Sequence, residues 1–95
     1  SDHGEEFGER GRVGHGTTLF GEAIDVPLLL RVPGTAPARL AAPVSTLGLL
    51  PTCAEIARLS GLPAMLGRDL RRAAAEPEPV FCETNQGGVL RAVID

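Results

Sequence analysis

The run Val26–Val32 limits the possible folds of this chain more than any other stretch. Arg31 is its only charged residue, and apolar side chains occupy both faces that a strand would present. A strand of this kind is typical of a buried parallel sheet, which has neighbours on both edges and helices on both faces. Because a single helix cannot cover such a sheet, the run predicts an α/β fold of which these residues supply only a part.

Composition narrows the class of protein. The 95 residues carry a net charge of −3, with 43% hydrophobic and 22% charged residues, as in a small globular domain with a limited core. The nine basic residues are scattered along the chain, so we expect no nucleic-acid partner. No apolar run approaches the roughly 18 residues of a membrane span, and no leader is recognisable. The compartment stays open, and a periplasmic or membrane-anchored parent protein is compatible with the sequence.

Two helical elements are expected. Residues 17–24 predict a helical turn, with Thr17 or Thr18 as its cap. Residues 49–60 predict a longer helix that ends at Gly61, because apolar and small residues recur on one face. That face comprises Leu49, Leu50, Cys53, Ile56, Ala57 and Ser60.

The C-terminal quarter predicts a linker and a hairpin. Prolines within residues 73–79 disfavour helix there and indicate an extended linker. Strand patterns over residues 80–83 and 89–94 flank a glycine-containing connection, which indicates an antiparallel hairpin. Cys53 and Cys82 lack the spacing of a metal site or a redox pair, so both are expected to be small buried hydrophobic residues.

The first sixteen residues carry the strongest sign of a binding site. They contain both histidines, His3 and His15, and Asp2 precedes the first of them. Carboxylate and imidazole groups suit a divalent metal, and the glycines let the loop fold back so that distant groups face one point. The same glycines argue against any helix or strand here. Charged side chains are expected to decorate the loop: Glu5, Glu6, Glu9, Arg10 and Arg12.

Five motifs occur in a fixed order along the chain: Ser1–Glu5, Gly14–Leu30, Pro33-Gly34, Ser45–Thr52 and Gly61-Leu62. In this order they resemble the C-terminal part of sulfatases, within the alkaline phosphatase superfamily. Residues 80–94 are similar to the start of the small antiparallel C-terminal subdomain of those enzymes. The resemblance implies a mixed sheet with flanking helices, in which residues 1–75 end the α/β core and residues 76–95 form a linker and hairpin.

The resemblance also implies roles for individual residues. Asp2 and His3 match two ligands of a divalent metal, generally Ca²⁺ in sulfatases and Zn²⁺ or Mn²⁺ in relatives that transfer phosphoryl groups. His15 matches a histidine close to the sulfate or phosphate oxygens, which implies a catalytic and substrate-binding role. Glu22 would have a structural role beside the site rather than a direct contact with the substrate or metal. Gly48 departs from the family pattern, since most members have Asp at this helix start.

The nucleophile of a sulfatase, in a Cys/Ser-x-Pro-x-Arg sequence, has no counterpart in these 95 residues, and neither Cys53 nor Cys82 fits it. The expectation is therefore part of a metal-dependent sulfatase that cleaves a small-molecule or glycan sulfate ester. The remainder of the parent chain would supply the nucleophile and further ligands, and the isolated chain would be inactive.

Two alternatives stay open at this point. One keeps the fold but changes the chemistry, to that of a phosphoethanolamine transferase or a phosphonate monoester hydrolase. The other is a non-catalytic interaction module. The compact length favours the module, whereas an exposed edge along Val26–Val32 would invite association and argues against it.

Overall fold

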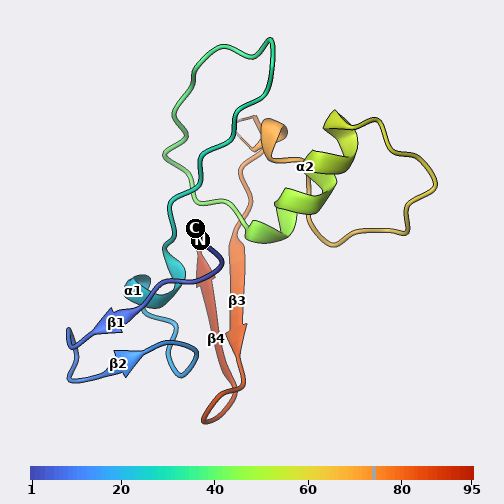
Figure 1. Cartoon of the computed structure of the whole chain (residues 1–95). Coiled ribbons are helices and arrows are strands. Elements are labelled where there is room, and N and C mark those ends of the chain that lie inside the picture. The colour runs from blue at the N-terminus through green and yellow to red at the C-terminus, as the bar shows by residue number, and fades with distance from the viewer. Residues whose placement is uncertain (74) are drawn as a thin grey trace. The chain divides into compact units, whose positions relative to one another are not determined.

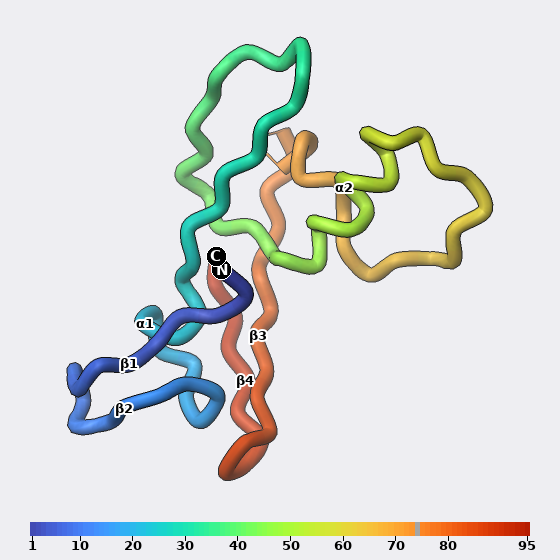
Figure 2. Tube along the Cα trace, viewed as in Figure 1, coloured from blue at the N-terminus to red at the C-terminus, as the bar shows by residue number. Residues whose placement is uncertain are grey.

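The computed structural model describes residues 1–73 and 75–95, which form two compact units. The first unit combines Ser1–Leu30 with Phe81–Val93, and the second combines Arg31–Val80 with Ile94–Asp95. Helices and two small antiparallel hairpins make the fold mixed α/β, which confirms the predicted class (Figures 1 and 2). The predicted division into residues 1–75 and 76–95 concerns a larger fold and stays a prediction.

A short hairpin occupies the N-terminal segment. Strand β1 (Glu6–Phe7) pairs with strand β2 (Val13–Gly14) in antiparallel register. The expectation of a loop without any strand is therefore wrong. Gly8 and Gly11 adopt φ values of 114° and 68° in the connection, which few other residues tolerate, so the glycines allow the chain to reverse and pair.

Helix α1 (Gly21–Ile24) is shorter than the turn predicted over residues 17–24. It follows Phe20 and has no side-chain cap, so the expectation of a threonine cap is wrong. Thr18 is buried and donates its hydroxyl hydrogen to Glu6 at 2.6 Å. A buried hydroxyl satisfies its hydrogen-bonding capacity wherever an acceptor lies, and here the acceptor lies in β1 rather than at the helix start.

The run Val26–Val32 is not a strand, and this prediction is wrong. Among residues 1–73 and 75–95, both sheets are two-stranded and neither includes this run. Leu29 is 91% exposed, and Leu28 and Leu30 are exposed as well. A strand exists only where a partner offers a hydrogen-bonding edge, and the described part of the chain offers none to this run.

The predicted C-terminal hairpin is confirmed. Strands β3 (Val80–Thr84) and β4 (Leu90–Ile94) lie antiparallel (Figure 1). Gly87 adopts a φ of 80° in the turn, a value that glycine reaches without strain. Cys82 in β3 is half-buried, and this burial, with the nearby negative charge of Asp25, raises the pKa of its thiol.

Helix α2 (Leu49–Ile56) continues from a 3₁₀ helix, η1 (Thr46–Gly48), whose first turn is capped by Ser45. The helix is confirmed, but the predicted buried face is wrong. Pro51, Thr52 and Ala54 are buried, whereas Leu50 is 66% exposed and Cys53 is exposed, against the expectation that Cys53 is buried.

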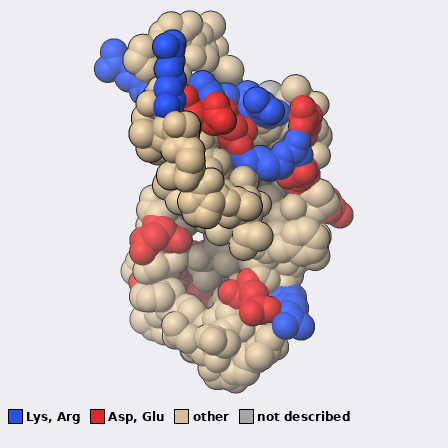
Figure 3. Space-filling view, turned by 90° about the vertical axis from the view of Figure 1, so that its right-hand side faces the viewer, with Lys and Arg blue, Asp and Glu red and all other residues tan. Residues whose placement is uncertain are grey.

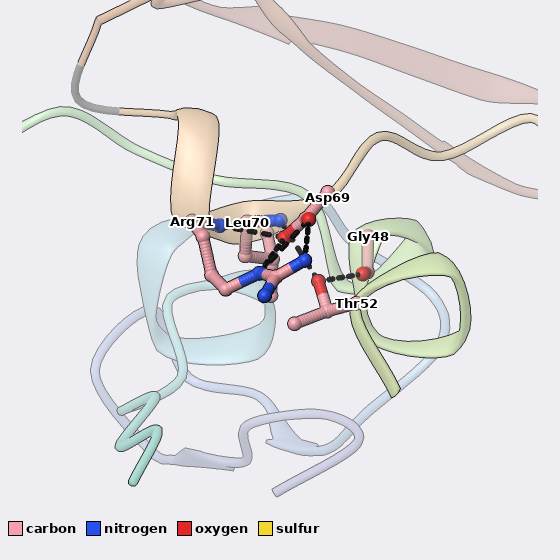
Figure 4. Close-up of polar contacts among 5 residues, drawn as sticks. All are labelled: Gly48, Thr52, Asp69, Leu70 and Arg71. Carbon is pink, nitrogen blue, oxygen red and sulfur yellow. Dashed lines mark hydrogen bonds and ion pairs between the residues drawn. The ribbon is translucent and has the colours of Figure 1, made fainter. Parts of the chain in front are cut away.

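Thr52 explains why this face is the buried one. Its hydroxyl donates to the Gly48 carbonyl oxygen at 2.6 Å and accepts from the Leu70 backbone N–H at 2.8 Å (Figure 4). The hydroxyl thus ties α2 to a second 3₁₀ helix, η2 (Leu70–Arg72). A β-carbon on Gly48 would lie 2.6 Å from the Arg68 carbonyl oxygen, which is backbone and cannot turn aside, so close packing requires glycine there.

Helix α2 ends at Ile56, before the predicted stop at Gly61. Arg58 has a left-handed φ of 54°, and its N–H donates to the Glu55 carbonyl oxygen at 3.1 Å. The Leu59 N–H donates to the Ala54 carbonyl oxygen at 3.0 Å. These two hydrogen bonds form a Schellman motif, in which an arginine takes the position that glycine usually fills.

The predicted linker begins with a turn instead of extended chain, since the backbone N–H groups of Ala75 and Glu76 both donate to the Arg72 carbonyl oxygen. Ala74, also within that prediction, lies outside the described residues.

Arg68 pairs with Glu76 and Glu78, and Figure 3 shows basic and acidic side chains beside one another on one face. No helix in the described ranges is long and apolar enough to cross a membrane.

Candidate functional site

The N-terminal hairpin brings the two histidines together. His3 lies before β1 and His15 directly follows β2, so pairing of the strands returns the chain to its start. The imidazole rings stack with their centroids 3.8 Å apart and their planes 26° from parallel. Two side chains twelve positions apart in the sequence therefore present nitrogen atoms at one place.

Glu5 is the third member of this cluster. Its Oε2 lies 3.0 Å from His15 Nδ1. The register explains the contact, because Glu6 is opposite Gly14 and the next position outward sets Glu5 opposite His15. Sequence reasoning treated Glu5 only as loop decoration. The signal that could have found it is the hairpin register, which is visible only once the strands are recognised.

His3 is held by its own neighbourhood. Its Nδ1 lies 2.8 Å from the Gly4 carbonyl oxygen, and since a carbonyl can only accept, Nδ1 carries the hydrogen. The lone pair of the neutral ring is then on Nε2. Gly4 is itself fixed, because its N–H donates to the Ala23 carbonyl oxygen at 2.8 Å.

Asp2 lies at the edge of the cluster. Its side chain is 91% exposed, and its Oδ2 is 3.9 Å from His3 Nε2. A hydrogen bond from its own backbone N–H, followed by the charge of His3, holds the pKa of Asp2 below its ordinary value. The carboxylate is therefore ionised at neutral pH and free to turn toward a cation beside His3.

The donor atoms suit a divalent metal. One ligand atom from each of His3, Glu5 and His15 can be chosen so that all three lie within 4.8 Å of one another. Two imidazoles and a carboxylate are a known ligand set of catalytic zinc, in which ligand atoms stand about 3.3 Å apart. The side chains of Glu5 and His15 are 36% and 44% exposed, so small rotations can close that difference. Calcium, by contrast, prefers oxygen ligands.

Two further acidic side chains, those of Glu6 and Glu22, accept hydrogen bonds in the same unit. Glu6 is only 1% exposed, so the expectation of a surface charge is wrong for this residue. Its Oε2 accepts from Thr18, while no partner of Oε1 is found among the described residues. Glu22 accepts from Arg10 at 2.5 Å, and this hydrogen bond lowers the pKa of Glu22. The Arg10 guanidinium also lies 3.9 Å from the centre of the Phe20 ring.

The C-terminal hairpin also contacts this loop within the first unit. The Thr84 hydroxyl donates to the carbonyl oxygen of Gly16, the residue after His15. A β-carbon on Gly16 would lie 2.6 Å from the Gln86 side chain, and its φ is 85°. Because the end of the Gln86 side chain can turn aside, it is the backbone turn that favours glycine at this position.

Comparison with known proteins links the chain to sulfatases. It is 30% identical over 86 residues to YidJ, an uncharacterised sulfatase of Escherichia coli (strain K12). The match covers 90% of this chain but 17% of the relative, so the chain spans about one sixth of that protein's length. No family model and no solved structure matches the chain. The similarity indicates a sulfatase-like relationship.

Proposed function

We propose that the chain is the part of a metal-dependent sulfatase that carries Asp2 and His3 as metal ligands and His15 as the contact to the sulfate group. The observation that carries this proposal is the stack of His3 on His15, with centroids 3.8 Å apart. It brings the Asp-His and His-Gly motifs of the resemblance to one place. The similarity to YidJ over 90% of the chain supports the same assignment.

Each residue has a role that its surroundings allow. His3 offers Nε2 to the metal, because Nδ1 is engaged by Gly4. Asp2 is ionised and exposed beside it, so its carboxylate can join the same ion. The bound metal would polarise the sulfuryl group as a Lewis acid. His15, stacked against His3, is placed to meet a sulfate oxygen or the leaving oxygen.

The nucleophile is proposed to lie outside these 95 residues, which contain no Cys/Ser-x-Pro-x-Arg sequence. The proposed substrate is a sulfate ester of a small molecule or glycan. The metal is Ca²⁺ if further carboxylates join Asp2 and His3, since calcium takes six or more oxygen-rich ligands. It would be Zn²⁺ or Mn²⁺ in a phosphoryl-transfer relative, in which His3, Glu5 and His15 would bind the ion together.

A second candidate function is phosphoryl or phosphonyl chemistry at the same site. The nitrogen-rich cluster of His3, Glu5 and His15 favours it, because these donors suit zinc better than calcium. Relatives of this class include phosphoethanolamine transferases and phosphonate monoester hydrolases. The metal and the preferred substrate would then differ together from those of a sulfatase.

The test uses the full-length protein that contains the chain. Asp2→Ala is expected to lower bound metal and turnover of an aryl sulfate in parallel, and Glu83→Gln, in an exposed ion pair with Arg91, serves as the control. Unchanged turnover in Asp2→Ala would sink the assignment. Comparing aryl sulfate, phosphate and phosphonate esters decides between the two chemistries, since the preferred ester should be hydrolysed at least about tenfold faster.

A further inference from the structure

The register of the N-terminal hairpin places Glu5 opposite His15. Glu6 pairs with Gly14 and Phe7 with Val13, so the outward continuation of the hairpin faces Glu5 with His15. Gly14 and Gly16 flank the histidine with φ values of 106° and 85°. Glycine adopts such φ values without strain, whereas other residues do not. The two glycines therefore allow the backbone to place the His15 imidazole beside the Glu5 carboxylate.

The hydrogen bond between them has a defined direction. An ionised carboxylate can only accept, so the hydrogen of the 3.0 Å contact belongs to His15 Nδ1. In the neutral ring the lone pair is then confined to Nε2. A carboxylate that binds one ring nitrogen fixes both the tautomer and the orientation of an imidazole.

The stack fixes the remaining freedom of the ring. His3 lies 3.8 Å away and nearly parallel, and its own Nδ1 is bound to the Gly4 carbonyl oxygen at 2.8 Å. Both imidazoles are thus held through Nδ1 by an oxygen of the same loop. Both Nε2 atoms are left for a ligand or a substrate.

We infer that Glu5 is a positioning residue, which holds the imidazole of His15 in its Nδ1–H tautomer so that Nε2 meets the transferred group. The part of this inference that concerns substrate rests on the proposed function. The part that concerns the tautomer does not. Glu5 touches His15 and acts through it, and in this assignment it is not a metal ligand.

Nuclear magnetic resonance of the full-length protein that contains the chain tests the tautomer directly. Histidine rings labelled with ¹⁵N are observed in metal-free buffer at about pH 9, well above the ordinary imidazole pKa of about 6.5. A His15→Asn variant assigns the signals. Nδ1 of His15 is expected to show the shift of a protonated nitrogen and Nε2 that of an unprotonated one.

Four variants make the test specific. Glu5→Ala is expected to raise the Nε2–H form of His15 to a substantial share, and Glu5→Asp to restore part of the Nδ1–H form. Glu9→Gln removes the same charge from the same loop without touching an imidazole, since Glu9 accepts from the Phe7 N–H, and should leave the tautomer unchanged. Glu5→Leu has a side chain of similar volume but no oxygen to accept the hydrogen bond, and it replaces Glu5→Ala should that variant unfold.

An Nε2–H tautomer in the wild-type protein, or no change of tautomer in Glu5→Leu and Glu5→Ala, would overturn the inference. In the full-length protein, Glu5→Gln is expected to lower kcat by about 10- to 100-fold with metal content retained. Loss of metal in that variant would make Glu5 a ligand and overturn its positioning role. A tautomer that depends on Glu5 in a protein without sulfatase, phosphatase or phosphonatase activity supports the inference and refutes the proposed function.

Discussion

The backbone N–H of Gly4 donates a 2.8 Å hydrogen bond to the carbonyl oxygen of Ala23. This contact joins the segment that carries His3 to helix α1. A β-carbon on Gly4 would lie 2.1 Å from the Glu22 carbonyl oxygen, so the approach leaves no room for any other residue. The position of the candidate site therefore depends on a glycine that offers no side-chain donor atom to the cluster.

Gly4→Ala is expected to lower the free energy of unfolding by about 1–3 kcal/mol, because the N-terminal segment must move away from α1. The same movement should separate the imidazole rings, which nuclear Overhauser effects between His3 and His15 can report. Gly34→Ala is the control, since Gly34 also faces a substitution penalty, from its φ of 76°, but has open space around it. Full retention of the ring contacts in Gly4→Ala would show that the close approach does not position His3.

Thr52→Val is expected to destabilise the second unit by about 1–3 kcal/mol. The valine keeps the shape of the side chain, but the buried Leu70 N–H loses its acceptor. Thr52→Ser retains the hydroxyl and should recover most of this loss. Urea unfolding followed by circular dichroism measures the three free energies, and equal values for Thr52→Val and Thr52→Ser would contradict the role given to the hydroxyl.

Arg58→Gly is expected to stabilise the chain by about 0.5–1 kcal/mol. Arg58 has a φ of 54°, and a left-handed conformation is costly for every residue with a β-carbon. The gain is the relief of that cost less the extra entropy of glycine in the unfolded chain. Arg58→Ala, which keeps the β-carbon, should show no such gain in thermal unfolding, and a less stable Arg58→Gly protein would argue against the Schellman geometry.

The ion pair of Asp69 with Arg71 predicts a pH dependence of stability. Arg71 donates to both carboxylate oxygens, and these hydrogen bonds hold the pKa of Asp69 below its ordinary value of 3.8. A folded-state pKa below the unfolded one stabilises the fold above the unfolded value. This contribution is lost as the pH falls through the lowered pKa.

Urea unfolding of the wild type and Asp69→Asn between about pH 6 and pH 2 measures this contribution. The difference in stability between the two proteins should be constant near neutral pH and shrink below about pH 3.9. Arg71→Gln should shrink the same difference, because it removes the group that lowers the pKa. A difference that does not change with pH would refute the assignment.

The parts of the fold that could be predicted are those that local pattern determines. The hairpin of β3 and β4 follows from alternating side chains around Gly87, and α2 follows from its apolar periodicity. The buried face of α2 could not be predicted, because it contains Thr52, a polar residue. Thr52 is buried because its hydroxyl forms hydrogen bonds with Gly48 of η1 and Leu70 of η2. The run Val26–Val32 was misjudged because strand formation depends on a partner, which no local pattern reveals.

In the candidate site, too, local pattern indicates some residues, whereas others depend on contacts between distant parts of the chain. Residue type alone makes Asp2, His3 and His15 candidates, and the glycines between them indicate a chain that folds back. Glu5 was missed because its relation to His15 arises from hairpin register. Glu6 was misjudged as a surface charge because its burial depends on Thr18, a residue that the sequence assigned to a helix cap.

The most direct test of the proposed site compares His3→Ala with His15→Ala in the full-length protein, with bound metal and aryl sulfate turnover measured on the same samples. The proposed roles predict that His3→Ala loses metal and turnover together, whereas His15→Ala keeps its metal and loses turnover by about 100-fold or more. A His3→Ala protein with full metal content and wild-type turnover would contradict the central claim that this loop holds a catalytic metal.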